Sequence, residues 1–90
     1  MINKSSFKLS VIIPCYNEKN TIKQIVKKVI ESLNYYKFSN YEIIVVDDCS
    51  TDGTKEILSR LDHIPNFELV INEKNNGKGF AVKTAIEKVT

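Results

Sequence analysis

A short apolar run that ends abruptly in two acidic residues constrains this chain more than any other feature. The run is Glu42–Val46, in which Ile or Val follows the first residue at every position, and Asp47 and Asp48 come directly after it. An unbroken apolar run of this length is typical of a strand covered on both faces, as in a parallel sheet with helices on each side. The run therefore predicts a buried strand whose carboxyl end carries charge.

Two other segments are predicted to be strands. Leu9–Ile13 is rich in β-branched residues and ends at Pro14, and Phe67–Ile71 follows Pro65. Helical spacing fills the intervals, with a first helix that Asn20 or Thr21 can cap. The first apolar stripe is Ile22, Ile25, Val26, Val29, Ile30 and Leu33; a short second helix, roughly Thr54 to Leu61, turns Ile57, Leu58 and Leu61 inward; and a third contains Ala81, Val82, Ala85, Ile86 and Val89.

Alternation of strands and helices with short links predicts an α/β fold: a three-layer, Rossmann-like parallel sheet with right-handed crossovers. Only the first three β-α units of such a sheet fit into residues 1–90. We therefore expect these residues to be the incomplete N-terminal part of one larger domain. At least one sheet edge would lie open, and an open edge favours self-association.

Charge and hydropathy exclude several classes of protein. Thirteen basic against eleven acidic residues leave a net charge of +2, too small to indicate nucleic-acid binding, and no face is expected to collect the basic residues. No apolar run approaches the ~20 residues that span a bilayer, and the polar start lacks a signal peptide. Two cysteines make no disulfide framework. We expect a cytoplasmic or cytoplasm-facing domain.

Three polar segments follow the three predicted strands: Pro14–Glu18, Asp47–Asp48 and Asn75–Gly79. Ligands of parallel α/β sheets bind outside the carboxyl ends of the strands, so these segments are expected to form one site. Because side chains alternate along an extended chain, Asp47 and Asp48 should face opposite ways. One would face the cleft, near a base, a ribose or a metal, and the other would cap the next helix; alternatively, both only stabilise the turn.

The other segments carry groups suited to a nucleotide. Tyr16 offers a flat face for a base, and Glu18 a carboxylate for sugar hydroxyls or a base N–H; the alternatives are an exposed loop aromatic and an acid favoured at a helix start. Lys78, between two glycines at the start of a helix, could attract phosphate, although the segment matches neither G-x-x-x-x-G-K-[ST] nor G-x-G-x-x-G and a glycine-rich turn is the alternative. His63 is the only histidine, which leaves no support for a Ser-His-Asp triad. Cys15 and Cys49 alone make no zinc site and are expected to be small, buried or half-buried loop residues.

These motifs, in this order and spacing, resemble family 2 glycosyltransferases over essentially the whole chain, and most closely the branch that contains dolichyl-phosphate mannose and glucose synthases. The matching segments are Ser10–Glu18, Ile44–Thr54 and Asn75–Ala81. The resemblance implies a GT-A fold, a UDP- or GDP-sugar donor and a role in cell-envelope or glycan biosynthesis. It places Pro14, Tyr16 and Glu18 around the nucleoside, Asp47 on the base with Asp48 nearby, and Lys78 near the nucleotide. Cys49 stands where many relatives have glycine.

The resemblance also implies which functional groups lie outside these residues. The Asp-x-Asp motif that holds Mg²⁺ or Mn²⁺ is expected after the third helix, and any catalytic base later still, so no catalytic or metal-binding residue is expected within the chain. The fragment would bind nucleotide without turnover and without a metal of its own. The complete enzyme would transfer sugar with inversion to a polyprenyl phosphate or a glycan, and many polyprenyl-phosphate relatives carry a membrane anchor.

Two other classes share parts of this pattern. A non-catalytic nucleotide-binding or regulatory α/β module would keep the fold without the catalytic half. A flavodoxin-like or response-regulator domain would share the acidic strand end, but a receiver domain would need a phospho-accepting Asp after the third strand, where Asn72 stands.

Overall fold

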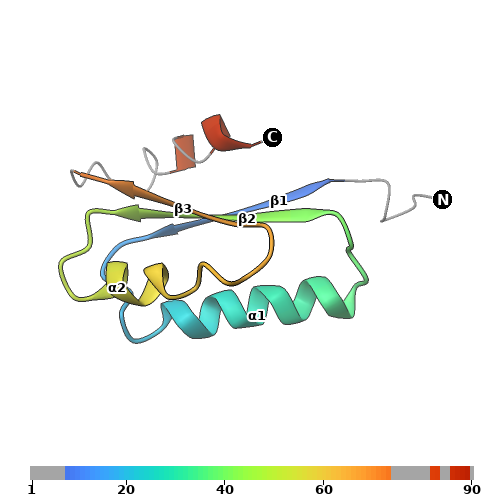
Figure 1. Ribbon diagram of the computed structural model, residues 1–90, viewed down its shortest axis with the longest axis horizontal. Coiled ribbons are helices and arrows are strands. Elements are labelled where there is room, and N and C mark those ends of the chain that lie inside the picture. Colours follow the sequence, from blue (N-terminus) through green and yellow to red (C-terminus); the bar gives the residue numbers. More distant parts are fainter. Residues whose placement is uncertain (1–7, 74–81, 84–85, 90) are drawn as a thin grey trace.

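The computed structural model describes residues 8–73, 82–83 and 86–89 (Figure 1). Strands and helices alternate along the chain, as the sequence predicted. The elements are β1 (Leu9–Cys15), α1 (Ile22–Tyr35), β2 (Tyr41–Asp48), α2 (Thr54–Ser59) and β3 (Phe67–Asn72). Of the predicted third helix, residues 82–83 and 86–88 are helical, and the rest lies outside the described residues.

The strands form one parallel sheet in the order β1-β2-β3, with β2 in the centre. Cys15 of β1 pairs in register with Asp47, and Asp48 pairs with Asn72 of β3. The carboxyl ends of all three strands therefore meet at one rim of the sheet, which lies at the left in Figure 1. The predicted convergence of the strand ends is confirmed.

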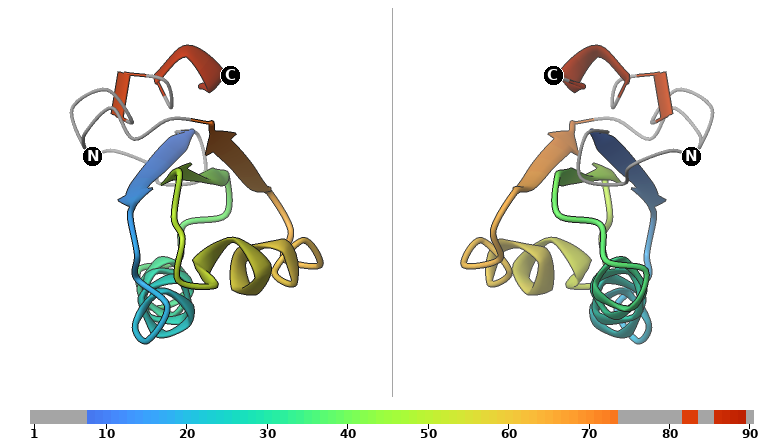
Figure 2. Two further views of the ribbon diagram at one scale, coloured as in Figure 1. Left: turned by 90° about the vertical axis from the view of Figure 1, so that its left-hand side faces the viewer. Right: turned by 90° about the vertical axis from the view of Figure 1, so that its right-hand side faces the viewer.

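The sheet has helical residues on both faces. Helices α1 and α2 lie side by side on one face, and the helical residues between 82 and 88 lie on the other (Figures 1 and 2). This is the predicted three-layer arrangement.

Strand β2 is buried on both faces, which explains its unbroken apolar sequence. Ile43 and Val45, both 0% exposed, pack in the cluster that contains Val26 of α1 and Leu58 of α2. The intervening residues turn to the other face; there Ile44 and Val46 pack with Ile12 and Val70. Alternation along the strand thus divides one apolar run between two cores.

The strands extend further than the sequence predicted. β1 continues through Pro14 to Cys15, since proline is tolerated in an edge strand, and β2 includes Asp47 and Asp48. Helix α2 ends at Ser59, although the residues expected to face inward pack as predicted: Leu58 and Leu61 are buried and Ile57 is half-buried.

The predicted side-chain cap of α1 is wrong. Thr21 occupies the N-cap position but makes no side-chain capping bond. Instead, the backbone carbonyl of Glu18 accepts hydrogen bonds from the backbone N–H groups of Thr21, at 3.0 Å, and Ile22, at 2.8 Å. The helix start is therefore held by the loop that leaves β1.

Candidate functional site

The loop after β1 is fastened to the loop after β2. Three consecutive backbone N–H groups, those of Asn17, Glu18 and Lys19, each donate to a side chain of the second loop. The acceptors are Ser50 Oγ at 2.9 Å, Thr54 Oγ1 at 3.0 Å and Asp52 Oδ2 at 3.1 Å. In the other direction, Asn17 Oδ1 accepts from the Thr51 N–H at 2.8 Å. Bonds in both directions fix the two loops as one unit at the rim of the sheet.

Two non-glycine residues of these loops have left-handed backbone conformations. Asn17 has φ of 51° and Cys49 has φ of 62°. Asparagine tolerates this region, whereas cysteine has no particular preference for it and glycine enters it without strain. The conformation gives a physical reason for the glycine that many relatives are expected to have where this chain has Cys49. The Cys49 thiol donates to the backbone carbonyl of Glu73 at 3.2 Å.

Asp47 lies inside the rim rather than on it. Its side chain is 0% exposed; Oδ2 accepts from the Ser50 N–H at 3.0 Å and Oδ1 accepts from the Ser50 hydroxyl. The Cys15 thiol also donates to Oδ1, at 3.9 Å. Burial, and then the negative charge of Asp47, raise the pKa of Cys15 to about 12, so this thiol keeps its proton at neutral pH. Asp47 thus closes the turn after β2 and links it to β1.

Asp48 turns to the opposite side, as strand alternation predicted. Its Oδ1 accepts from Asn72 Nδ2 at 3.3 Å, which links β2 to β3. Neither aspartate caps α2, so that part of the prediction is wrong. Gly53, with φ of 101°, occupies the N-cap position of α2. The side chain of Asp52 accepts from the N–H of Thr54, at 3.0 Å, and from its hydroxyl. The hydroxyl bond lowers the pKa of Asp52.

Of the four remaining predicted site residues, three lie in the described part of the structure and one does not. Tyr16 directly follows β1 and is 37% exposed, while Pro14 is half-buried within β1. Glu18 is half-buried, and its Oε2 accepts from the Thr21 hydroxyl at 3.0 Å. These residues lie at the rim, next to the buried Asp47 and Asp48. Lys78, with the rest of the third polar segment, lies outside the described residues.

The residues that join the two loops were not predicted from the sequence. These are Asn17, Ser50, Asp52 and Thr54. A local signal existed, because Asp followed by Ser three residues later and Asp followed by Thr two residues later are spacings at which side chains bond to nearby backbone. That signal predicts the turn, but the partner loop lies more than thirty residues away in sequence.

Neither a metal site nor a membrane span is found in the described part of the chain. Among residues 8–73, 82–83 and 86–89, no group of three or more His, Cys, Asp or Glu side chains is placed to hold a metal ion. Within the same residues, no helix has both the length and the apolar character that crossing a bilayer requires.

A parallel sheet between two helical layers, with polar loops at the carboxyl ends of its strands, is typical of α/β proteins that bind ligands at those loops. Comparison with known families identifies which member of this class the chain is. The family described as glycosyl transferase family 2 matches residues 10–90, and the chain belongs to it.

Known relatives and solved structures agree with this assignment. A dolichyl-phosphate beta-glucosyltransferase of Dictyostelium discoideum is 42% identical over 86 residues, which cover 87% of this chain and 26% of the relative. The mannosyltransferase PcManGT from Pyrobaculum calidifontis, solved with GDP-Man and Mn²⁺, superposes with a TM-score of 0.80 at 29% identity, over 94% of this chain and 26% of its own. S. aureus TarS 1-349, solved with UDP, gives 0.74 at 28% identity, over 92% and 24%.

These comparisons confirm the GT-A fold that the resemblance implied. The chain spans about a quarter of the length of these proteins.

Proposed function

We propose that residues 1–90 are the N-terminal, donor-binding part of a glycosyltransferase that uses a UDP- or GDP-sugar. The observation that carries the proposal is the set of hydrogen bonds that joins the two loops at the rim of the sheet. Backbone N–H groups of the β1–α1 loop donate hydrogen bonds to side chains that follow β2. The Tyr16 side chain, directly after β1, stays partly exposed. A rigid loop with an available aromatic face suits a nucleobase, because little conformational entropy is lost on binding.

Each rim residue has a proposed role. Tyr16 stacks on the base, Pro14 forms part of the wall beside it, and the half-buried Glu18 accepts a hydrogen bond from the nucleoside. Asp47 and Asp48 are proposed to act mainly by positioning, since they are 0% and 2% exposed and already accept hydrogen bonds within the protein. The role of Lys78, near the diphosphate, rests on the family resemblance alone.

The acceptor and the metal are proposed from the relatives. The similarity to a dolichyl-phosphate glucosyltransferase supports a polyprenyl phosphate acceptor, with a glycan as the second candidate. A lipid phosphate is already anionic and needs little help from a general base, and one in-line attack inverts the sugar carbon. Mn²⁺ in a solved neighbour supports a divalent cation in the complete enzyme, held by residues outside those described here. We propose a cytoplasmic location, at the cytoplasmic face of a membrane if the acceptor is a lipid.

Calorimetric titration of the chain with UDP, GDP and ADP, with and without Mn²⁺, tests the donor-binding role. We expect saturable binding of UDP or GDP and weaker binding of ADP. Glu18→Gln should weaken that binding by about tenfold, because it removes a charged acceptor. Asp62→Asn, at an exposed position after α2, is the control and should bind like the wild type. Equal affinity for all three nucleotides, or no binding, would contradict the proposal.

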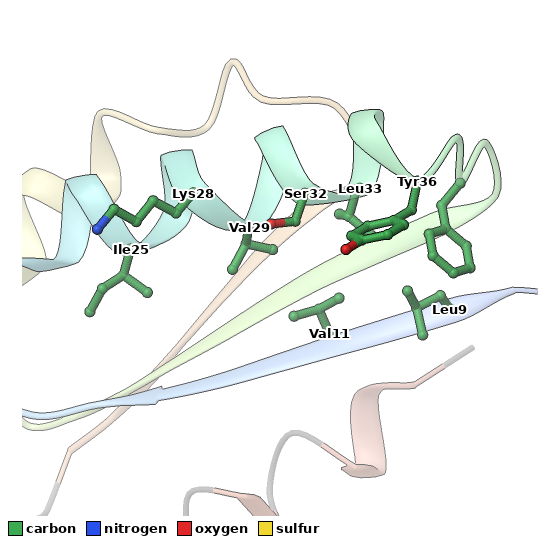
Figure 3. Close-up of a pocket in the computed structure, with 9 residues that line it drawn as sticks. Leu9, Val11, Ile25, Lys28, Val29, Ser32, Leu33 and Tyr36 are labelled. Carbon is green, nitrogen blue, oxygen red and sulfur yellow. The ribbon is translucent and has the colours of Figure 1, made fainter.

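We also propose that the chain self-associates through β1. Among the described residues, no strand pairs with the outer edge of β1. Beside that edge lies an apolar groove of about 430 Å³, where side chains of α1, including Ile25, and of Tyr36 just after it extend toward the side chains of β1 (Figure 3). Ile25 is 38% exposed and Tyr36 is 55% exposed, so a second copy that pairs with the edge can cover both.

Sedimentation equilibrium over a range of protein concentrations tests this association. We expect a concentration-dependent dimer, which Tyr36→Glu weakens because it places a charge in the apolar groove. Tyr35→Glu is the matched control: Tyr35 is the neighbouring residue, is more exposed and does not line the groove. A monomer at every concentration, or equal effects of the two substitutions, would contradict the proposal.

A further inference from the structure

A second groove runs between α1 and α2, on the face of the helical layer. It consists of two adjoining hollows of about 470 Å³ each, which share Lys23, Leu61 and His63. The two helices lie side by side below the sheet in Figures 1 and 2. Lys19 and Asn20, from the loop at the nucleotide rim, line the hollow nearer that rim. The groove therefore begins at the same end of the molecule as the candidate site.

The charged side chains that line this groove are mostly cations. Lys19, Lys23, Lys27 and Arg60 all line it and are all exposed, and Glu31 is the one acid among the lining residues. The lining residues carry a net charge of +3, which exceeds the net charge of +2 of the whole chain. The expectation that no face collects the basic residues is wrong for this groove.

The floor of the groove is apolar. Leu61 and Val26 are buried in the main core, and three half-buried side chains pack against that core and also line the hollows: Ile30, Ile57 and Ile64. A cationic border above an apolar floor is the pattern of surfaces that lie in the interface of a bilayer, where basic groups meet lipid headgroups and apolar groups meet the upper acyl region.

We propose that the α1–α2 groove docks the chain on a bilayer through anionic lipid headgroups. Charge complementarity selects an anionic occupant, and the apolar floor favours a lipid over a free phosphate ion, which would leave that floor uncovered. Docked in this way, α1 and α2 face the membrane, and the rim with the proposed nucleotide site lies close to the membrane surface. This inference does not depend on nucleotide binding, because none of the four cations belongs to the proposed nucleoside pocket.

Vesicle co-sedimentation of the chain tests the proposal. We expect binding to vesicles that contain phosphatidylglycerol, little binding to phosphatidylcholine alone, and loss of binding as salt rises. The double substitution Lys23→Gln with Lys27→Gln should weaken binding by about tenfold or more, because each basic residue near an anionic surface contributes on the order of 1 kcal/mol. Thermal unfolding of each variant checks that the exposed substitutions leave the fold intact.

The matched control removes the same charge outside the groove. Lys83→Gln with Lys88→Gln changes two exposed residues on the opposite face of the sheet, and neither lines a groove described above. Binding by this variant should stay within about twofold of the wild type, since neither residue would face the lipid. Equal losses in both double variants would overturn the proposal, because they would show a general charge effect.

Two competitor arms separate a bilayer from other anions. Inorganic phosphate should displace the chain from vesicles no better than chloride at the same ionic strength. Stronger displacement by phosphate would assign the groove to a free phosphate ligand and overturn the proposal. Binding to single-stranded RNA that depends on Lys23 and Lys27, without binding to vesicles, would overturn it as well.

Discussion

Asp47→Ala is expected to lower the unfolding free energy of the chain by about 2–4 kcal/mol, since a buried charged acceptor and its hydrogen bonds are removed together. The N–H and the hydroxyl of Ser50 both donate to this carboxylate, and in its absence both donors lie in a buried turn without a partner. Urea denaturation measures the loss as a lower midpoint at an unchanged slope.

Two further variants show whether the loss comes from these bonds. Asp47→Asn keeps one acceptor oxygen and should fall between Ala and the wild type. Ser50→Ala removes the hydroxyl partner, and its effect should not add to that of Asp47→Ala, because the two side chains share one interaction. A loss below about 1 kcal/mol for Asp47→Ala would mean that the turn holds its shape without the carboxylate.

Tyr16→Ala is expected to weaken binding of the preferred nucleotide by about five- to a hundredfold, because stacking of a base on an aromatic ring contributes ~1–3 kcal/mol. The unfolding free energy should change little, since this ring is partly exposed and the substitution leaves the backbone contacts of the loop in place. Calorimetric titration with UDP and GDP gives the affinities, and urea denaturation gives the stability.

Two controls define the contribution of the ring. Tyr16→Phe keeps the stacking face and should retain most of the affinity. Tyr35→Ala removes an equally large ring at the far end of α1 and should leave nucleotide affinity unchanged. If Tyr16→Ala binds like the wild type while remaining folded, Tyr16 is a surface aromatic and the proposed nucleoside pocket is wrong.

The parts of the fold that follow from local patterns were predictable. The apolar run before Asp47 gave a central strand, and helical spacing from residue 22 to residue 33 gave α1, because burial on one or both faces leaves its period in the sequence. The strand ends were less predictable. Proline and aspartate commonly end strands. Here Pro14 stays within β1 because β1 is an edge strand, and Asp47 stays within β2 because Ser50 of the following turn donates to its carboxylate.

The candidate site was predictable in outline only. Parallel strands bring their carboxyl ends together, so the meeting of Tyr16, Asp47 and Asp48 followed from topology. Alternation predicted that the two aspartates face opposite ways but could not show that both are buried. Burial depends on side chains from other elements, such as Cys15 beside Asp47 and Asn72 beside Asp48. The cationic groove needed the packing of two helices to bring Lys23 and Arg60 together.

The proline within β1 limits how any additional strand could extend the sheet. Because pairing with β2 continues through Cys15, the donor that Pro14 lacks belongs on the open side of the strand. An incoming backbone can therefore form an uninterrupted ladder only along Leu9–Ile13, away from the rim. A dimer formed through this edge would therefore leave the proposed nucleotide site at the rim accessible.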